Sequence, residues 1–177
     1  MKIKDENVFI YLIDDDELHA KLLQSKFETS TNFQFFSFIS GEEFLEDLQK
    51  NPIPKRYIPI VILDFFLNID REKYKNGIEI LKKIKQINPN IEVIMYSVNE
   101  DANVKAEAMQ YGAVTYIRKN ENAFLRILNN IKWLISKNQL DKKRRASKAT
   151  LFFFILVIIG LTAAGLIIYF IFPDLLK

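Results

Sequence analysis

The feature that most constrains the fold is a repeated alternation between short apolar runs and segments with helical spacing. Five apolar or aromatic runs are each followed by a segment whose apolar residues recur every three or four positions. Continuous apolar runs of this kind are typical of strands covered on both faces. The alternation therefore predicts an α/β domain with a doubly wound, five-stranded parallel sheet. The expected strands are 8–13, 33–38, 60–63, 91–97 and 113–117, and the expected helices are 17–28, 40–48, 77–87, 100–111 and 122–135.

Two of these helices have local features that support them. In the first, the apolar residues Leu18, Leu22, Leu23 and Phe27 follow helical spacing, which predicts one buried stripe. The second opens with a serine at position 40 and a glutamate three residues later, the pattern of a capping box.

Polar residues with related chemistry follow the ends of four expected strands. Asp14 and Asp15 follow the first strand, Asp64 the third, Ser97 the fourth and Lys119 the fifth. In an open parallel sheet, ligands bind beyond the carboxyl ends of the strands, so we expect these groups to converge. Clustered carboxylates repel one another, and raised pKa values or a bound cation must relieve this repulsion. Oxygen ligands with few carboxylates favour Mg²⁺, which completes its shell with water and phosphate.

The acidic run at positions 14–17 divides between two roles in this interpretation. Asp16 and Glu17 are expected at the start of the first helix, where negative charge complements the helix dipole. An acidic run alone is more often a solvated helix start than a metal site. The metal prediction therefore rests on all the strand ends together.

Residues 5–136 resemble the receiver domain of response regulators in two-component signalling. The resemblance rests on an acid pair after the first strand, an aspartate after the third, a hydroxyl after the fourth and a lysine after the fifth. It implies a flavodoxin-like sheet with strand order 2-1-3-4-5. It also implies that Asp64 accepts a phosphoryl group from a histidine kinase or a phosphotransfer protein. Mg²⁺ would be held by Asp14, Asp15, Asp64 and the backbone carbonyl of Phe66.

The same resemblance assigns roles to three further residues. Lys119 would pair with the acyl phosphate, and the Ser97 hydroxyl would move to bond a phosphoryl oxygen. Tyr116 matches the aromatic switch position on the last strand and would turn inward as Ser97 moves. His19, the single histidine of the chain, is interpreted as a surface residue and not as a phosphodonor.

The end of the sequence predicts a membrane anchor. Residues 151–172 carry no charge, and a helix of this length spans a hydrocarbon core of ~30 Å at ~1.5 Å per residue. We therefore expect a transmembrane helix over 149–172, a basic junction over 137–148 and a short non-cytoplasmic tail over 173–177. Gly160 and Ala164 form a small-xxx-small pair compatible with a homodimer, although such pairs are common by chance.

The basic junction sets the expected orientation. Its positive residues, which should also attract anionic lipid, place residues 5–136 on the cytoplasmic side of the inner membrane by the positive-inside rule. These residues are Lys142, Lys143, Arg144, Arg145 and Lys148. No glycine or proline occurs from 122 to 159, so the last helix of the receiver either ends near 135 or continues toward the membrane.

Two classes of function remain open from the sequence. The first is a phosphorylatable signalling module at the membrane that acts on a downstream protein; the second is a receiver-like scaffold that localises partners without phosphotransfer. The sequence indicates a binding module and not an enzyme. Nucleic-acid binding is not expected, because the basic residues concentrate in one short segment and do not spread over a folded face. The absence of cysteine excludes disulfides and thiolate metal sites.

Overall fold

The computed structural model describes residues 7–54, 56–67, 76–98 and 101–171. Within the last of these ranges, some side chains lie outside the described residues, namely those of 142, 145, 146, 148, 149, 151 and 164–171. The chain divides into two compact units, Met1–Leu134 and Ile135–Lys177.

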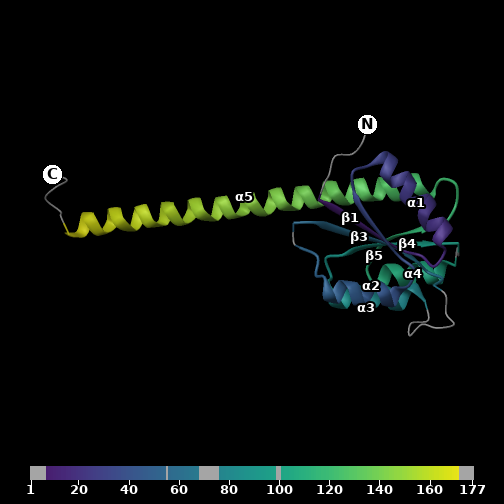
Figure 1. Ribbon diagram of the computed structural model, residues 1–177. Helices are drawn as coiled ribbons and strands as arrows, with labels where there is room; N and C mark the ends of the chain where they lie inside the picture. The colour runs from purple at the N-terminus through teal and green to yellow at the C-terminus, as the bar shows by residue number, and fades with distance from the viewer. Residues whose placement is uncertain (1–6, 55, 68–75, 99–100, 172–177) are drawn as a thin grey trace. The chain divides into compact units, whose positions relative to one another are not determined.

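The first unit alternates strands and helices as the sequence predicts (Figure 1). The strands all pair in parallel in the order β2-β1-β3-β4-β5, which confirms the predicted sheet and its flavodoxin-like order. The strands are β1 (Val8–Ile13), β2 (Gln34–Phe38), β3 (Ile58–Asp64), β4 (Glu92–Ser97) and β5 (Ala113–Arg118). The helices are α1 (Glu17–Ser30), α2 (Gly41–Lys50), α3 (Gly77–Ile87), α4 (Ala102–Gln110) and α5 (Ala123–Ile171).

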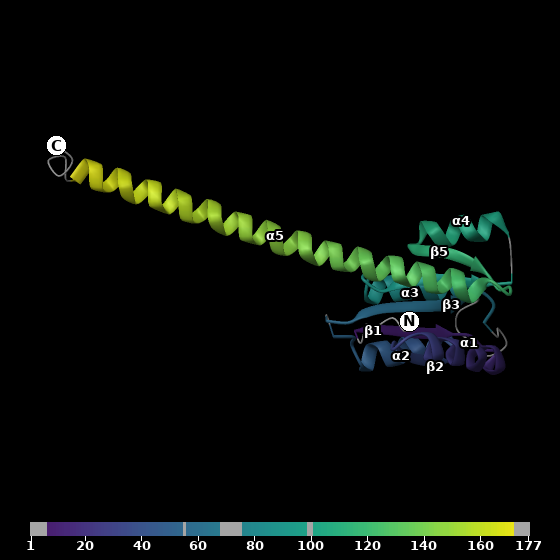
Figure 2. The same ribbon diagram turned by 90° about the horizontal axis from the view of Figure 1, so that it is seen from above.

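Helices cover both faces of the sheet, because alternate residues of each strand point to opposite sides. On one face, Tyr11, Val61 and Met95 belong to a core cluster that includes buried residues of α2, α3 and α4. The other face is covered by α1 and the first part of α5, as Figures 1 and 2 show. There Phe27 of α1 packs edge-on against Phe124 of α5, with ring centroids 5.2 Å apart. Burial on both faces explains why the central strands read as continuous apolar runs.

The apolar stripe predicted for α1 was partly wrong. Leu23 and Phe27 are buried, but Leu18 and Leu22 are 70% and 57% exposed. The buried stripe runs instead through Ala20, Leu23 and Phe27, a spacing of three and then four residues. With this stripe facing the sheet, His19 lies toward the ends of the strands.

Side-chain caps fix the starts of α1, α2 and α3. Asp16 caps α1 by accepting from the His19 N–H at 3.0 Å, so its predicted place at the helix start is confirmed. Ser40 caps α2 by accepting from the Glu43 N–H at 3.1 Å, as the capping pattern predicts. Asn76 caps α3 by accepting from the N–H groups of Ile78 and Glu79.

Helix α5 continues far beyond residue 135, so the continuous alternative is the one observed. The absence of glycine and proline before Gly160 leaves no local signal to end it. Among the residues that the structure describes, no helix is both long and apolar enough to cross a membrane. Several side chains of the predicted span at 149–172 lie outside the described residues, and the whole tail 173–177 does so as well. The span is therefore not supported here, and the predicted segment boundaries stay predictions.

Candidate functional site

The predicted acidic residues meet at the carboxyl ends of β1 and β3. Asp64 is the last residue of β3, and Asp14 follows β1, whose Ile13 pairs with Leu63 of β3. Asp14 is 1% exposed and Asp64 is 5% exposed, whereas Asp15 is half-buried. One carboxylate oxygen from each of the three lies within 4.8 Å of the others. The neighbouring positions of the two central strands therefore produce a compact set of hard oxygen ligands.

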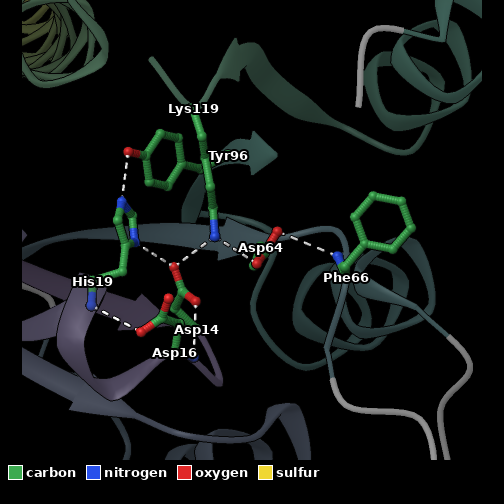
Figure 3. Close-up of polar contacts among 7 residues, drawn as sticks. All are labelled: Asp14, Asp16, His19, Asp64, Phe66, Tyr96 and Lys119. Atoms are coloured by element: carbon green, nitrogen blue, oxygen red, sulfur yellow. Dashed lines mark hydrogen bonds and ion pairs between the residues drawn. The ribbon is translucent and has the colours of Figure 1, made fainter. Parts of the chain in front are cut away.

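Lys119 supplies the positive charge that the buried carboxylates require. Its Nζ donates to Asp14 Oδ2 at 2.8 Å and to Asp64 Oδ2 at 2.6 Å (Figure 3). The Lys119 N–H also donates to the Ser97 carbonyl at 2.8 Å, which ties the end of β5 to the end of β4. The structure thus confirms that Lys119 converges with the acids, although more than 50 residues separate it from each in sequence.

The two carboxylates differ in electrostatics although they share one ammonium. Burial raises the pKa of Asp14, but hydrogen bonds from His19 and Lys119 outweigh it and lower the pKa. Burial also raises the pKa of Asp64, and its bonds to Lys119 do not fully offset this effect. Burial lowers the pKa of Lys119, but the two carboxylates that it bonds raise this pKa by more. The net shift is upward, so the ammonium stays charged.

The turn after Asp64 is held by backbone contacts. The Phe66 N–H donates to Asp64 Oδ1 at 3.2 Å (Figure 3), and the Phe66 ring is 46% exposed. The Gly77 N–H at the start of α3 donates to the Phe65 carbonyl at 2.9 Å. A role for the Phe66 carbonyl as a metal ligand stays a prediction.

Ser97 and Tyr116 lie together on the face of the sheet covered by α2, α3 and α4. Ser97 is fully buried and Tyr116 is 7% exposed. Burial raises the pKa of the Tyr116 hydroxyl, and a side-chain hydrogen bond with Ser97 offsets part of that rise. The ring that was expected to turn inward is therefore already buried in this structure, in contact with the hydroxyl expected to move. Its role as a switch stays a prediction.

The interpretation of His19 as a plain surface residue was wrong. Its Nδ1 lies 2.8 Å from Asp14 Oδ2 and its Nε2 lies 3.0 Å from Tyr96 Oη (Figure 3). A signal was present in the sequence, because His19, Leu23 and Phe27 follow one another at intervals of four on α1. The assumed stripe through Leu18 and Leu22 concealed it.

The donor set fits a small divalent cation. Three carboxylates within reach of one another, with a charged lysine beside them, match the oxygen-rich and incomplete ligand sets that Mg²⁺ occupies together with water and phosphate. Asp64, with its raised pKa and its like-charged neighbour Asp14, is the group that a cation would relieve most.

Comparison with known proteins agrees with this geometry. Residues 10–131 match the family model of the response regulator receiver domain. The transcriptional regulatory protein ZraR of Escherichia coli O157:H7 is 28% identical over 114 residues, which is 64% of this chain but 23% of ZraR. The sporulation initiation phosphotransferase F of Bacillus subtilis is 28% identical over 108 residues, 61% of this chain and 79% of that protein. The chain thus spans less than a quarter of the length of ZraR.

A solved structure shows the same fold. The CheY-like response regulator receiver domain protein from Methanospirillum hungatei JF-1 superimposes with a TM-score of 0.63 at 18% identity, covering 77% of this chain and 99% of the other. The family match covers well over half of the sequence and includes the polar residues at the ends of β1, β3, β4 and β5. This chain belongs to the response regulator receiver domain family.

Proposed function

We propose that this chain is a receiver that accepts a phosphoryl group on Asp64 from a histidine kinase or a histidine phosphotransfer protein. The observation that carries the proposal is a buried aspartate with an ammonium 2.6 Å from its Oδ2 and two further carboxylates within 4.8 Å. The name of the related sporulation phosphotransferase, which describes phosphoryl transfer, supports the same class of reaction.

The reaction forms one bond and breaks another. An Asp64 carboxylate oxygen attacks phosphorus, the bond between phosphorus and the partner's histidine nitrogen breaks, and the nitrogen leaves with the electron pair. The product is an acyl phosphate on Asp64. Such transfer depends mainly on positioning and on neutralising charge. Asp14, Asp15, Asp64 and the Phe66 carbonyl would hold Mg²⁺, which when bound neutralises charge on the phosphoryl oxygens.

Lys119 and Ser97 act on the product in this proposal. The Lys119 ammonium, now shared between Asp14 and Asp64, pairs with the phosphoryl oxygens once Asp64 is phosphorylated. The Ser97 hydroxyl exchanges its bond with Tyr116 for a phosphoryl oxygen, and the change at Tyr116 alters the surface read by a downstream protein. In this proposal the chain is a signalling module and not an enzyme with a separate substrate.

We also propose that the module is tethered to the inner membrane with the receiver on the cytoplasmic side. The support is the sequence alone: an uncharged run over 151–172 directly after a basic segment over 137–148.

The phosphoryl-transfer proposal is tested on the full chain in detergent with Mg²⁺ and acetyl phosphate as the donor. We expect intact mass to rise by one phosphoryl group in the wild type and in Asp16→Asn, whose cap position tolerates the change. Asp64→Asn should not gain this mass. A wild-type chain that stays unmodified with acetyl phosphate and with phosphorylated kinases would favour the scaffold alternative.

A further inference from the structure

The contacts of Asp14 extend beyond the residues that the family pattern supplies. Asp14 Oδ2 accepts from Lys119 Nζ and lies 2.8 Å from His19 Nδ1, while Asp14 Oδ1 accepts from the Asp16 N–H at 3.1 Å. A carboxylate has about four acceptor positions. Donors in the described part of the chain use three of these positions, two on Oδ2 and one on Oδ1. The orientation of the carboxylate is set by donors on both of its oxygens.

The two ring nitrogens of His19 have different hydrogen-bonding partners. Asp14, with its lowered pKa, is a carboxylate that only accepts hydrogen bonds, so His19 Nδ1 must donate. Burial raises the pKa of Tyr96, which keeps its proton. His19 Nε2 lies 3.0 Å from Tyr96 Oη, a hydroxyl that can donate or accept, so both ring nitrogens have a hydrogen-bonding partner.

Tyr96 supports both of the side chains that bond Asp14 Oδ2. It is 3% exposed, and its ring stacks on the His19 ring with centroids 5.3 Å apart. The Lys119 Nζ lies 5.3 Å from the centre of the same ring. One buried tyrosine on β4 thus fixes the position of the imidazole through its hydroxyl and contacts the ammonium through its ring face.

We propose that His19 is a positioning residue of the acidic site, which holds the Asp14 carboxylate in one orientation for Mg²⁺ and is itself held by Tyr96. This inference rests on the proposed phosphoryl-transfer function. Hydrogen bonds to ligating carboxylates fix their orientation, and removing such a partner typically weakens metal binding about 10-fold or more. Loss of a donor also has an opposing effect, because a carboxylate with fewer hydrogen bonds is more basic and binds a cation more tightly. Whether Mg²⁺ affinity falls or rises on loss of the His19 donor therefore decides the proposal.

The experiment measures the Mg²⁺ dissociation constant of the full chain in detergent by isothermal titration calorimetry, with MgCl₂ as the probe. We expect His19→Ala to weaken binding about 10-fold. His19→Asn keeps an N–H donor at the position of Nδ1 and should recover most of the affinity. Tyr96→Phe keeps the ring and loses the hydroxyl, so we expect a smaller loss. Leu22→Ala is the matched control, because Leu22 lines the same cavity as His19 and Tyr96 without a polar contact.

The outcomes separate this inference from the proposed function. Unchanged or tighter Mg²⁺ binding by His19→Ala overturns the positioning role while leaving phosphoryl transfer intact. The positioning role is equally overturned if His19→Asn binds as weakly as His19→Ala, since the donor would then not matter. A wild-type chain that binds no Mg²⁺ overturns both. If His19→Ala does not fold, Tyr96→Phe decides: a loss of Mg²⁺ affinity supports the positioning role, and wild-type affinity overturns it.

Discussion

At the scale of single residues, the acidic site is an unequal division of one ammonium between two carboxylates. Lys119 donates a hydrogen bond to both carboxylates. Asp14 also accepts hydrogen bonds from His19 and from the Asp16 N–H, whereas Asp64 also accepts one from the Phe66 N–H. Asp64 is thus the less compensated of the two buried charges. A buried charge with incomplete compensation is common where a group is kept for chemistry and not for stability.

Replacing Asp64 should therefore stabilise the fold. In the absence of Mg²⁺ at pH 7, we expect Asp64→Asn to raise the free energy of unfolding by about 1 kcal/mol. The folded-state pKa of Asp64 is raised, so its contribution to stability is fully present below the unfolded pKa and is lost as pH rises through the folded pKa. The gain from Asp64→Asn should accordingly shrink as pH falls toward 4.

Thermal unfolding followed by circular dichroism at pH 7 and pH 4 measures this difference. Asp16→Asn is the control, because Asp16 is exposed and asparagine is an equally good helix cap. A lower melting temperature for Asp64→Asn than for wild type at pH 7 would show that the carboxylate is a net stabilising group.

At the scale of elements, the turns between strands and helices place the reactive groups. Within β4, Tyr96 points toward α1 and bonds His19, while Ser97 points to the opposite face and bonds Tyr116. The period of two along a strand thus lets two successive residues serve opposite sides of the same site. After β3, the start of α3 packs directly against the backbone of the turn after Asp64, at Gly77.

A side chain at position 77 should disturb this turn. A Cβ there would meet the carbonyl oxygen of Asp64 and the Cα of Phe65, which are backbone atoms that cannot move without shifting Asp64. We expect Gly77→Ala to cost about 1–3 kcal/mol of stability, the range of overpacking. We also expect slower phosphorylation by acetyl phosphate.

Gly41→Ala is the comparison for this prediction, since a Cβ at position 41 would meet the side chain of Ile80 and not backbone. Its loss of melting temperature should be smaller, and its phosphorylation rate should be that of the wild type. Equal effects of the two substitutions on the rate would mean that the position of α3 does not set the geometry of Asp64.

At the scale of the whole molecule, charge and apolar character are distributed unevenly along the chain. Acidic and basic residues nearly balance over 1–136, basic residues concentrate over 137–148, and the run over 151–172 has no charge. This order is the one expected of a domain held at a membrane by a following helix.

The tether is tested by placing one charge in the uncharged run. We expect the full chain to stay in the membrane fraction after alkaline carbonate extraction of expressing cells. A lysine near the middle of a span costs roughly 2.5–3.5 kcal/mol, so Ile158→Lys should release a substantial part of the protein. Leu140→Lys, outside the run, should behave as wild type. Extraction of the wild-type chain by carbonate would refute the tether.

Patterns in the sequence were enough to predict the architecture and most of the acidic site. Strand and helix periodicities are local, and they identified every strand and helix of the sheet domain. The carboxyl ends of parallel strands lie along one edge, so Asp14, Asp64 and Lys119 could be brought together from their positions after strands alone.

The contacts of His19 and the burial of Tyr116 could not be predicted from the sequence. His19 bonds Tyr96 across a separation of 77 residues, and that contact depends on how α1 is rotated about its axis. Leucines on two adjacent stripes of α1 left that rotation ambiguous in the sequence, and packing of Ala20, Leu23 and Phe27 against the sheet resolved it. The burial of Tyr116 against Ser97 likewise depends on side-chain packing between neighbouring strands, which periodicity along one strand does not encode.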